Sequence, residues 1–299
     1  MYEDATARFM ADPPTTAIRR VATLEVGVPN PEATAGFFED CLDFVRRDEP
    51  DGRIALTVEG EYGLGSPPSV LTLRQNDALI LDAVVLEVAD REGLVDVTTR
   101  LDNAGHFIEC LSDEIRFEAP EGVPLICRVA PQRSRQPLPP STVRPRRLGH
   151  VNLKVPDAIK TRDFFVDVLG FALSEQVGDL LAFLRVAGDH HNIGLRGGEA
   201  VANVHHIAME VPGWDSFLVI CDYIAAKGHS VEYGPGRHGP GHNLFVYLRE
   251  PDSGLRMELF ADMGRIDDAT AYQPHLWEAQ DRSRTVNQWG PAPPPSFFE

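Results

Sequence analysis

Two histidines and one glutamate of this 299-residue chain could together hold a divalent metal ion. His150 opens the segment HVNLKV, His206 opens HIAMEV, and Glu258 stands between apolar residues in LRMELF. A carboxylate in apolar surroundings needs a strong partner, and a divalent cation is one. Two imidazoles and one carboxylate form the facial set that holds non-haem Fe(II) and leaves positions open for substrate and O₂. The three residues therefore predict a metal site, provided that the fold brings them together.

Both histidine segments are typical of β-strands. Because side chains alternate across a strand, Asn152 shares the face of His150, and we expect it to contact the substrate. The same alternation places Glu210 on the face of His206. Taken singly, a histidine at a strand end is more often hydrogen-bonded or solvated than a ligand, and a lone glutamate usually faces water. The combination of ligand types favours the metal hypothesis.

Neighbouring residues leave an alternative open. His205 precedes His206, and His190 precedes His191 in DHHNIGL. A shift of one residue in strand register would turn the neighbour toward the site instead. Glu210 is the corresponding alternative to the glutamate ligand.

The segment GPGRHGPGHNLFVY, residues 234–247, formally matches G-x-G-x-x-G and carries His238 and His242. A dinucleotide site would need a helix after the glycines, whose N-terminus holds the pyrophosphate. The residues that follow, NLFVYLREPDSG, are rich in β-branched and aromatic types and close on a turn, so they predict a strand. The glycines therefore shape a loop, and its histidines are the chemical candidates.

An internal repeat predicts the elements that must position these residues. RRVATLEVGVPNPEATAGFFEDCLDF from Arg19 resembles RRLGHVNLKVPDAIKTRDFFVDVLGF from Arg146, and the stretch from Asp82 resembles the stretch from His205. Each of the four similar units has room for one strand, one helix and three further strands. We predict an α+β fold of four βαβββ units paired into two modules.

The first module provides an internal control for the metal hypothesis. The repeat aligns the three candidate ligands with Thr23, Ala83 and Ile126, none of which matches its counterpart. Nine of the ten histidines lie at or after His150. We therefore expect the second module alone to carry the chemistry.

The predicted organisation has five parts. They are an arm (1–17), a metal-free module (18–135), a linker rich in proline and arginine (136–146), a catalytic module (147–262) and a tail (263–299). The linker should be extended. The polar tail, ending in NQWGPAPPPSFFE, is expected along the surface.

With these motifs the chain resembles the type I extradiol ring-cleavage dioxygenases of the vicinal oxygen chelate superfamily, such as catechol 2,3-dioxygenase. The resemblance covers roughly residues 18–262 and implies that each module is a cupped mixed β-sheet with outer helices. The family's ligand triad corresponds to His150, His206 and Glu258, and its G-x-x-H-H-x-A strand start is similar to VHHIAMEV, in which the second histidine is the ligand.

The resemblance also assigns further site residues. His191 corresponds to a histidine that the family uses in acid-base work and in stabilising bound oxygen. The family's R-H-G-x-x-H segment and its following tyrosine correspond to the stretch from Arg237 to Tyr247, which makes His238 and Tyr247 catalytic and substrate-binding candidates. His242 is expected to shape the loop or to make an outer contact with the substrate. Arg282 and Arg284 in the tail have no clear counterpart.

The resemblance implies ring opening of a catechol-type aromatic by O₂ at Fe(II), with Mn(II) as the other metal that could serve. A glyoxalase-like isomerase or lyase would usually want a fourth protein ligand. A non-catalytic sequestering protein would not need His191, His238 and Tyr247 beside the triad. Relatives on this fold also suggest a homo-oligomer.

Composition indicates which other partners and which cellular compartment to expect. The formal net charge of −17 argues against nucleic-acid binding, which needs clustered cations. Cys41, Cys110, Cys127 and Cys221 are scattered, as expected for free thiols in a reducing compartment. Apolar runs stop short of the roughly 18 residues that would span a bilayer. We expect a cytoplasmic protein without a membrane segment.

Overall fold

The computed structural model describes residues 16–58, 61–63, 69–131, 133–135, 138, 140–268, 271–278 and 282–298. Nearly all of the predicted arm lies outside these ranges. The first module is built around an eight-stranded sheet with the order β2-β3-β5-β1-β6-β9-β8-β7. Its elements are β1 (Ile18–Val28), α2 (Pro31–Leu42), β2 (Val45–Asp48), β3 (Ile54–Thr57), β5 (Leu71–Gln75), β6 (Ile80–Val88), α3 (Arg91–Asn103), β7 (Glu109–Cys110), β8 (Glu114–Ala119) and β9 (Val123–Val129).

The second module repeats this plan in a nine-stranded sheet with the order β16-β17-β18-β15-β11-β14-β13-β12-β19. Its elements are β11 (Arg147–Lys154), α4 (Ala158–Asp167), β12 (Ala172–Val177), β13 (Leu181–Arg185), β14 (Ile193–Arg196), β15 (Asn203–Glu210), α5 (Trp214–Ala226), β16 (Tyr233–Arg237), β17 (Leu244–Arg249) and β18 (Arg256–Ala261). The four predicted βαβββ units are confirmed. Two short strands, β4 (Glu61–Gly63) and β10 (Arg133–Arg135), pair with each other outside them.

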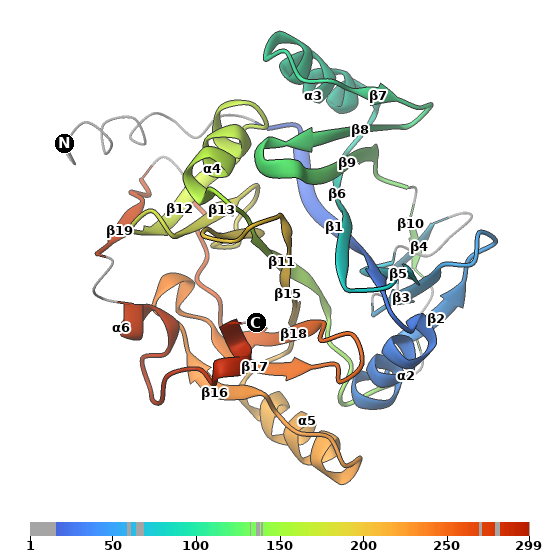
Figure 1. Cartoon of the computed structure of the whole chain (residues 1–299), viewed down its shortest axis with the longest axis vertical. Coiled ribbons are helices and arrows are strands. Elements are labelled where there is room, and N and C mark those ends of the chain that lie inside the picture. Colours follow the sequence, from blue (N-terminus) through green and yellow to red (C-terminus); the bar gives the residue numbers. More distant parts are fainter. Residues whose placement is uncertain are drawn as a thin grey trace.

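Equivalent residues start the first helix of each module. Asn30 caps α2 by accepting a hydrogen bond from the Ala33 amide at 3.1 Å. Asp157, which the repeat aligns with Asn30, caps α4 by accepting from the amides of Ile159 and Lys160, both at 2.9 Å. Such caps satisfy amides that have no partner within the helix. Figure 1 shows the four long helices at the outside of the two sheets, as predicted.

The two modules share buried contacts, including one continuous apolar cluster that draws residues from both sheets. Thr34 in α2 donates a hydrogen bond to Glu250 after β17 at 3.2 Å. Gly234 and Gly236 lie within β16, so of the glycines in GPGRHG only Gly239 belongs to the loop that the sequence predicted. A 3₁₀ turn at Pro240–His242 then leads into β17, so a strand follows, as predicted, and the dinucleotide interpretation fails. None of the helices in the described ranges is long and apolar enough to cross a membrane.

The C-terminal tail differs from the expectation of a purely surface-lying segment. Its strand β19 (His275–Trp277) pairs in parallel with β12 and becomes an edge of the second sheet. It continues through α6 (Arg282–Val286) to a 3₁₀ turn at Pro295–Phe298, where Phe297 is buried. The tail therefore belongs to the folded second module.

Candidate active site

Strand register brings the three predicted ligands to one face of the second sheet. β11 and β15 run antiparallel, with His150 opposite Ala208 and Asn152 opposite His206. β15 and β18 run parallel, with Ala208 beside Glu258. Directly opposed residues point to the same face of a sheet. His150, His206 and Glu258 therefore lie on one face, with the histidine of β15 between the ligands of β11 and β18.

The three side chains meet at hydrogen-bonding distance. His206 Nε2 lies 3.0 Å and His150 Nε2 3.3 Å from Glu258 Oε2, and the two imidazole nitrogens lie 3.2 Å apart. All three residues are at most 4% exposed. Two imidazole nitrogens and a carboxylate oxygen in mutual contact are a donor set that suits a divalent cation of the Fe(II) or Mn(II) type. They form a 2-His-1-Glu metal site.

The alternative registers are not adopted. Glu210 forms an ion pair with Arg147 and stands apart from the metal site. His205 and His190 lie behind their neighbours: His205 Nδ1 is 2.7 Å from His206 Nδ1, and His190 Nδ1 is 3.1 Å from His191 Nδ1. These two residues support the inward-facing histidines.

Electrostatics stabilise the ionised carboxylate. Burial alone would raise the pKa of Glu258, but the adjacent His150 and His206 hold it well below its usual range. Burial lowers the pKa of His206 to about 4, against the opposing effect of the glutamate. At neutral pH His206 is therefore a neutral imidazole and Glu258 a negative carboxylate, the protonation states that metal binding requires of them.

A polar residue that the sequence reasoning missed also holds the carboxylate. Asn243 is fully buried, and its amide Nδ2 donates to Glu258 Oε1 at 2.8 Å. Tyr247 lies opposite Glu258 in the β17–β18 pair, and its hydroxyl lies 2.8 Å from Oε2. Together they orient the glutamate from both sides. An asparagine at the head of an apolar strand, in HNLFVY, was the available signal.

The predicted catalytic residues surround the triad. The His191 ring centroid lies 4.2 Å from that of His150. His238 stacks on Phe245 at 4.1 Å, and its Nε2 lies 3.0 Å from the Tyr247 hydroxyl. Burial lowers the pKa of His191 and of His238 and raises that of Tyr247 above its usual value. All three groups are therefore neutral near pH 7.

Known proteins share this arrangement. Residues 147–259 match the model of the Glyoxalase/Bleomycin resistance protein/Dioxygenase superfamily. The chain is 25% identical to metapyrocatechase from Pseudomonas sp. (strain CF600) over 296 residues, which cover 90% of this chain and 94% of that protein. A variant of homoprotocatechuate 2,3-dioxygenase from Brevibacterium fuscum superposes with a TM-score of 0.83 at 25% identity, covering 96% of this chain and 82% of that one. Residues 147–259 thus belong to this superfamily, and the chain is similar over nearly its whole length to extradiol ring-cleavage dioxygenases.

A third relative is more similar in a shorter region. The chain is 34% identical over 157 residues to metapyrocatechase 2 from Cupriavidus necator, a match that covers 52% of this chain and 48% of that protein. The matched part is thus about half the length of this relative, whereas the Pseudomonas protein is matched over nearly its whole length.

The metal site opens into a cavity of about 100 Å³. Its polar lining includes the ligands, Asn152, His191, His238 and Tyr247. The remaining wall combines four polar residues, Arg196, His205, Asn243 and Thr285, with six apolar ones, Leu181, Phe183, Pro240, Val286, Phe297 and Phe298. Val286, Phe297 and Phe298 belong to the tail, whose part in the cavity the sequence did not predict, whereas Pro240 lies in the GPGRHGPGHNLFVY segment.

Three further residues were considered in the sequence: His242, Arg282 and Arg284. His242 is exposed and does not line the cavity, so the substrate contact predicted for it has no support in this geometry. Arg284 is exposed in α6 and also lies outside the cavity wall. The side chain of Arg282 lies outside the described part of the chain.

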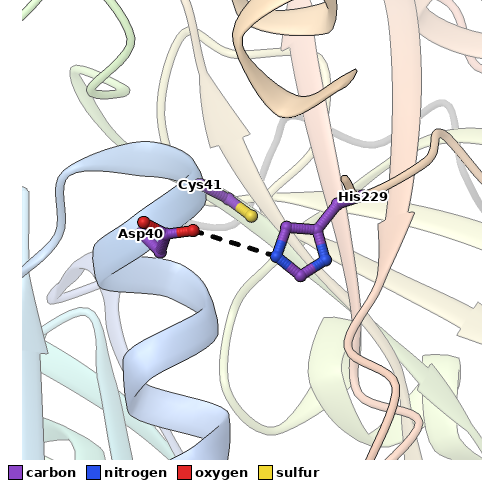
Figure 2. Close-up of side chains that lie close together, drawn as sticks. All are labelled: Asp40, Cys41 and His229. Carbon is purple, nitrogen blue, oxygen red and sulfur yellow. Dashed lines mark ion pairs between the residues drawn. The ribbon is translucent and has the colours of Figure 1, made fainter. Parts of the chain in front are cut away.

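A second group of donor side chains, Asp40, Cys41 and His229, joins the two modules (Figure 2). The Lys227 ammonium lies 2.6 Å from Asp40 and already neutralises that carboxylate. Burial raises the pKa of the Cys41 thiol to about 12, so it is not a thiolate at neutral pH. Since the thiolate is the form that binds metals, these residues form a contact between α2 and the segment after α5.

Proposed function

We propose that this protein opens a catechol-type aromatic ring with O₂, next to the vicinal hydroxyls, using Fe(II) held by His150, His206 and Glu258. The observation that carries the proposal is the buried triad at the wall of a cavity that also contains neutral acid-base groups. The metal would act as a Lewis acid and hold the two reactants side by side. Mn(II) is the second candidate, because a relative at 23% identity is a manganese-dependent 2,3-dihydroxybiphenyl 1,2-dioxygenase from Geobacillus genomosp. 3.

His238 and Tyr247 are suited to take a proton from the substrate. The Val286 carbonyl can only accept, so His238 Nδ1, 2.6 Å away, carries the proton of the neutral ring. His238 Nε2 is then an acceptor. The single Tyr247 hydroxyl proton has two acceptors, His238 Nε2 at 3.0 Å and Glu258 Oε2 at 2.8 Å. With Tyr247 donating to the glutamate, the His238 lone pair is available for a substrate hydroxyl proton.

His191 supplies a second proton-transfer group. Its Nδ1 lies 3.1 Å from His190 Nδ1, and His190 Nε2 lies 3.3 Å from Glu175 Oε1, an ion-pair distance without hydrogen-bond geometry. A proton on His190 Nε2, which that carboxylate favours, leaves His190 Nδ1 to accept from His191. Neutral His191 then has a bare Nε2 that can accept a proton and, once charged, donate to developing negative charge.

The cavity walls favour an apolar ring substituent. Phe183, Phe297 and Phe298 offer aromatic surface where a substrate ring can stack or pack edge to face. The glyoxalase-like alternative has less support, because within the described residues no fourth histidine, cysteine or carboxylate joins the metal group. The family resemblance further supports a homo-oligomer.

An aerobic assay tests the proposal. Protein reconstituted with Fe(II) is given unsubstituted, alkyl-, phenyl- and carboxylate-bearing catechols while O₂ uptake and the yellow ring-opened product are followed. Cleavage is expected, with the highest kcat/KM for apolar substituents. Mn(II)-loaded protein in parallel distinguishes the two metals. If neither metal form consumes O₂ with any catechol, the proposed activity is wrong.

A further inference from the structure

Two backbone carbonyls of the C-terminal tail (residues 275–298) reach the histidines of the site. The Phe297 carbonyl lies 3.1 Å from His205 Nε2, and the Val286 carbonyl lies 2.6 Å from His238 Nδ1. Val286 ends α6 and Phe297 lies in the final 3₁₀ turn, and a loop connects the two. In Figure 1 the C-terminus lies beside β17 and β18, the strands that carry Tyr247 and Glu258. The tail thus contacts groups on which the site's chemistry depends.

A carbonyl oxygen can only accept a hydrogen bond, which decides where a neutral imidazole carries its proton. His205 is 6% exposed, the Arg256 guanidinium donates to its backbone carbonyl, and no carboxylate of the described residues pairs with its ring. A buried imidazole without an anionic partner carries a single proton. Its proton is therefore on Nε2, donating to Phe297, and its Nδ1 has a bare lone pair. By the same reasoning the proton of His238 is on Nδ1.

The tautomer of His205 fixes the tautomer of the metal ligand next to it. His205 Nδ1 and His206 Nδ1 are 2.7 Å apart. Because the first is an acceptor, the second must donate. A neutral His206 with its proton on Nδ1 has a bare Nε2, and this is the atom that lies 3.0 Å from Glu258 Oε2 within the triad. The carbonyl of Phe297 therefore determines, across two rings, that a ligand lone pair faces the metal.

We propose that the C-terminal tail is a positioning element of the active site, which sets the proton of His238 directly and that of the ligand His206 through His205. This inference rests on the proposed metal-dependent function. It makes His205 a positioning residue, since its Nδ1 contacts the ligand His206 and its role is exerted through that ligand. Hydrogen bonds of this kind orient a ligating histidine and raise its basicity.

The tail is anchored independently of the histidines it contacts. Arg256 Nη2 donates to the Ser296 carbonyl at 2.9 Å, and the guanidinium lies 4.9 Å from the Phe297 ring centroid. Glu232 accepts from both Arg256 Nε at 2.6 Å and Ser296 Oγ at 3.0 Å. This buried ion pair holds the last turn in place. The carbonyl is thus a fixed acceptor, as an element that selects one tautomer must be.

The tautomers can be measured without any substrate. The full chain, labelled with ¹⁵N-histidine and loaded with diamagnetic Zn(II), is studied by long-range ¹H–¹⁵N correlation spectroscopy. We expect the proton of His205 on Nε2 and those of His206 and His238 on Nδ1. Observation of His205 with its proton on Nδ1 would overturn the proposal. The measurement uses the wild-type protein, so it does not depend on the folding of a variant.

The hydrogen bonds that run from the Phe297 carbonyl through His205 to His206 are called the relay below. Variants measure what this relay contributes to metal binding. His205→Phe removes both hydrogen bonds, and we expect the Kd for Fe(II), measured by chelator competition, to rise roughly 10- to 100-fold. His205→Gln should recover part of that loss, because its amide can accept from His206 and donate to Phe297. His275→Gln, an exposed histidine of the same tail, is the matched control and should bind Fe(II) as wild type does.

Wild-type affinity in His205→Phe, with His206 still protonated at Nδ1, would contradict the relay. These readouts are separate from ring cleavage. If the wild-type protein binds metal with the expected tautomers but cleaves no catechol, the proposed activity fails and the relay stands. If it cleaves catechols but shows the opposite tautomers, the relay alone fails.

Discussion

The two modules have the same strand register, but only the second carries metal-ligand side chains at the equivalent positions. In the second module His150 lies opposite Ala208, which lies beside Glu258. In the first, Thr23 lies opposite Val85, which lies beside Ile126. The repeat alignment thus holds residue by residue across three strands. Position in the fold is shared, and the side chains at these positions distinguish a metal site from a packed sheet.

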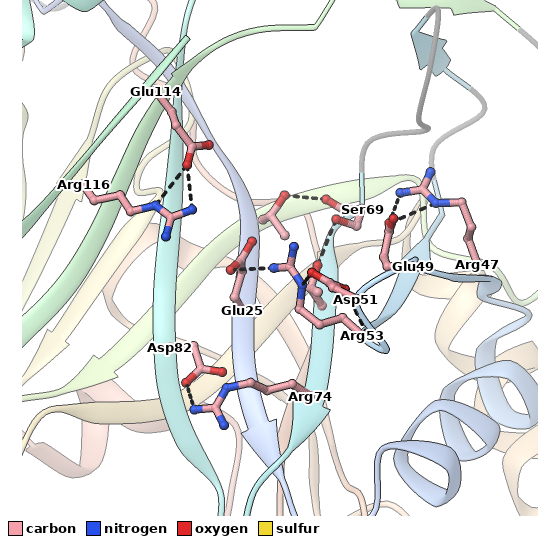
Figure 3. A network of polar contacts seen from close by, with 12 residues as sticks. Glu25, Arg47, Glu49, Asp51, Arg53, Ser69, Arg74, Asp82, Glu114 and Arg116 are labelled. Carbon is pink, nitrogen blue, oxygen red and sulfur yellow. Dashed lines mark hydrogen bonds and ion pairs between the residues drawn. The ribbon is translucent and has the colours of Figure 1, made fainter. Parts of the chain in front are cut away.

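The concave faces also differ in what covers them. In the second module the tail supplies Val286, Phe297 and Phe298 to the cavity wall. The first module has a cleft of about 650 Å³ to which the described tail residues contribute nothing. Its polar side chains form ion pairs with each other: Arg53 with Glu25 at 3.2 Å, Arg74 with Asp82 at 2.6 Å, and Arg116 with Glu114 at 2.8 Å (Figure 3). Glu25 stands where the second module has Asn152. A reactive site on this scaffold therefore needs both ligands and a cover that excludes water.

The largest expected effect is loss of the carboxylate ligand. Glu258→Ala should weaken Fe(II) binding by more than about 100-fold, since even outer contacts cost roughly 10- to 100-fold. Ile126→Ala at the equivalent place in the first module is the control and should leave the metal content at one ion per chain. Metal analysis after gel filtration measures both. Full metal retention and turnover in Glu258→Ala would place the carboxylate ligand elsewhere, and a tight second ion near Thr23, Ala83 and Ile126 would break the comparison.

Removal of an acid-base group should spare the metal. His191→Phe is expected to retain Fe(II) while kcat falls by about 10²- to 10⁴-fold, the usual contribution of such a group. The combination separates this residue from the ligands, because its ring contacts His150 without joining the triad. Steady-state O₂ uptake and iron content are measured on the same sample. A near-normal kcat would transfer the role to another group, with His190 the next residue to change.

The internal repeat and strand alternation predicted the four units and the ligand triad, whereas His191, His238 and Tyr247 came from the family resemblance, and their roles stay predictions. Sequence reasoning missed Asn243 and the tail. Phe297 lies 92 residues from His205 along the chain, and no periodicity reports a contact between a backbone carbonyl and a ring at that separation. Sequence reasoning also gave His242 a substrate contact, whereas in the structure this residue is exposed and does not line the cavity. Long-range packing, and not propensity, decides such details.

A smaller contrast is expected within the loop between β16 and β17. His238→Ala should lower kcat/KM at least about tenfold more than His242→Ala, because only His238 faces the cavity and general acid-base groups typically contribute about 10² or more. Tyr247→Phe should resemble His238→Ala, since the tyrosine hydroxyl shares a proton network with that ring. Kinetics at saturating O₂ with iron content held equal measure this ranking. The reverse order, with His242→Ala more damaged, would show that the loop adopts another arrangement in the working enzyme.

The smallest expected effect is that of a change at Thr23, the residue of the metal-free module that aligns with the ligand His150. Thr23 is 1% exposed, and its hydroxyl donates to the Ser69 carbonyl at 2.6 Å. Thr23→Val keeps the shape but leaves that carbonyl without this donor, so the free energy of unfolding should fall by about 1 to 3 kcal/mol, whereas kcat should not change. Thr98→Val is the matched control: its hydroxyl bonds the Leu94 carbonyl within α3, which the helix already satisfies, so the loss should stay within about 0.5 kcal/mol. Urea unfolding midpoints compare the two. A large loss of turnover in Thr23→Val, at temperatures where the variant is folded, would mean that the first module takes part in the chemistry and is not merely a structural copy.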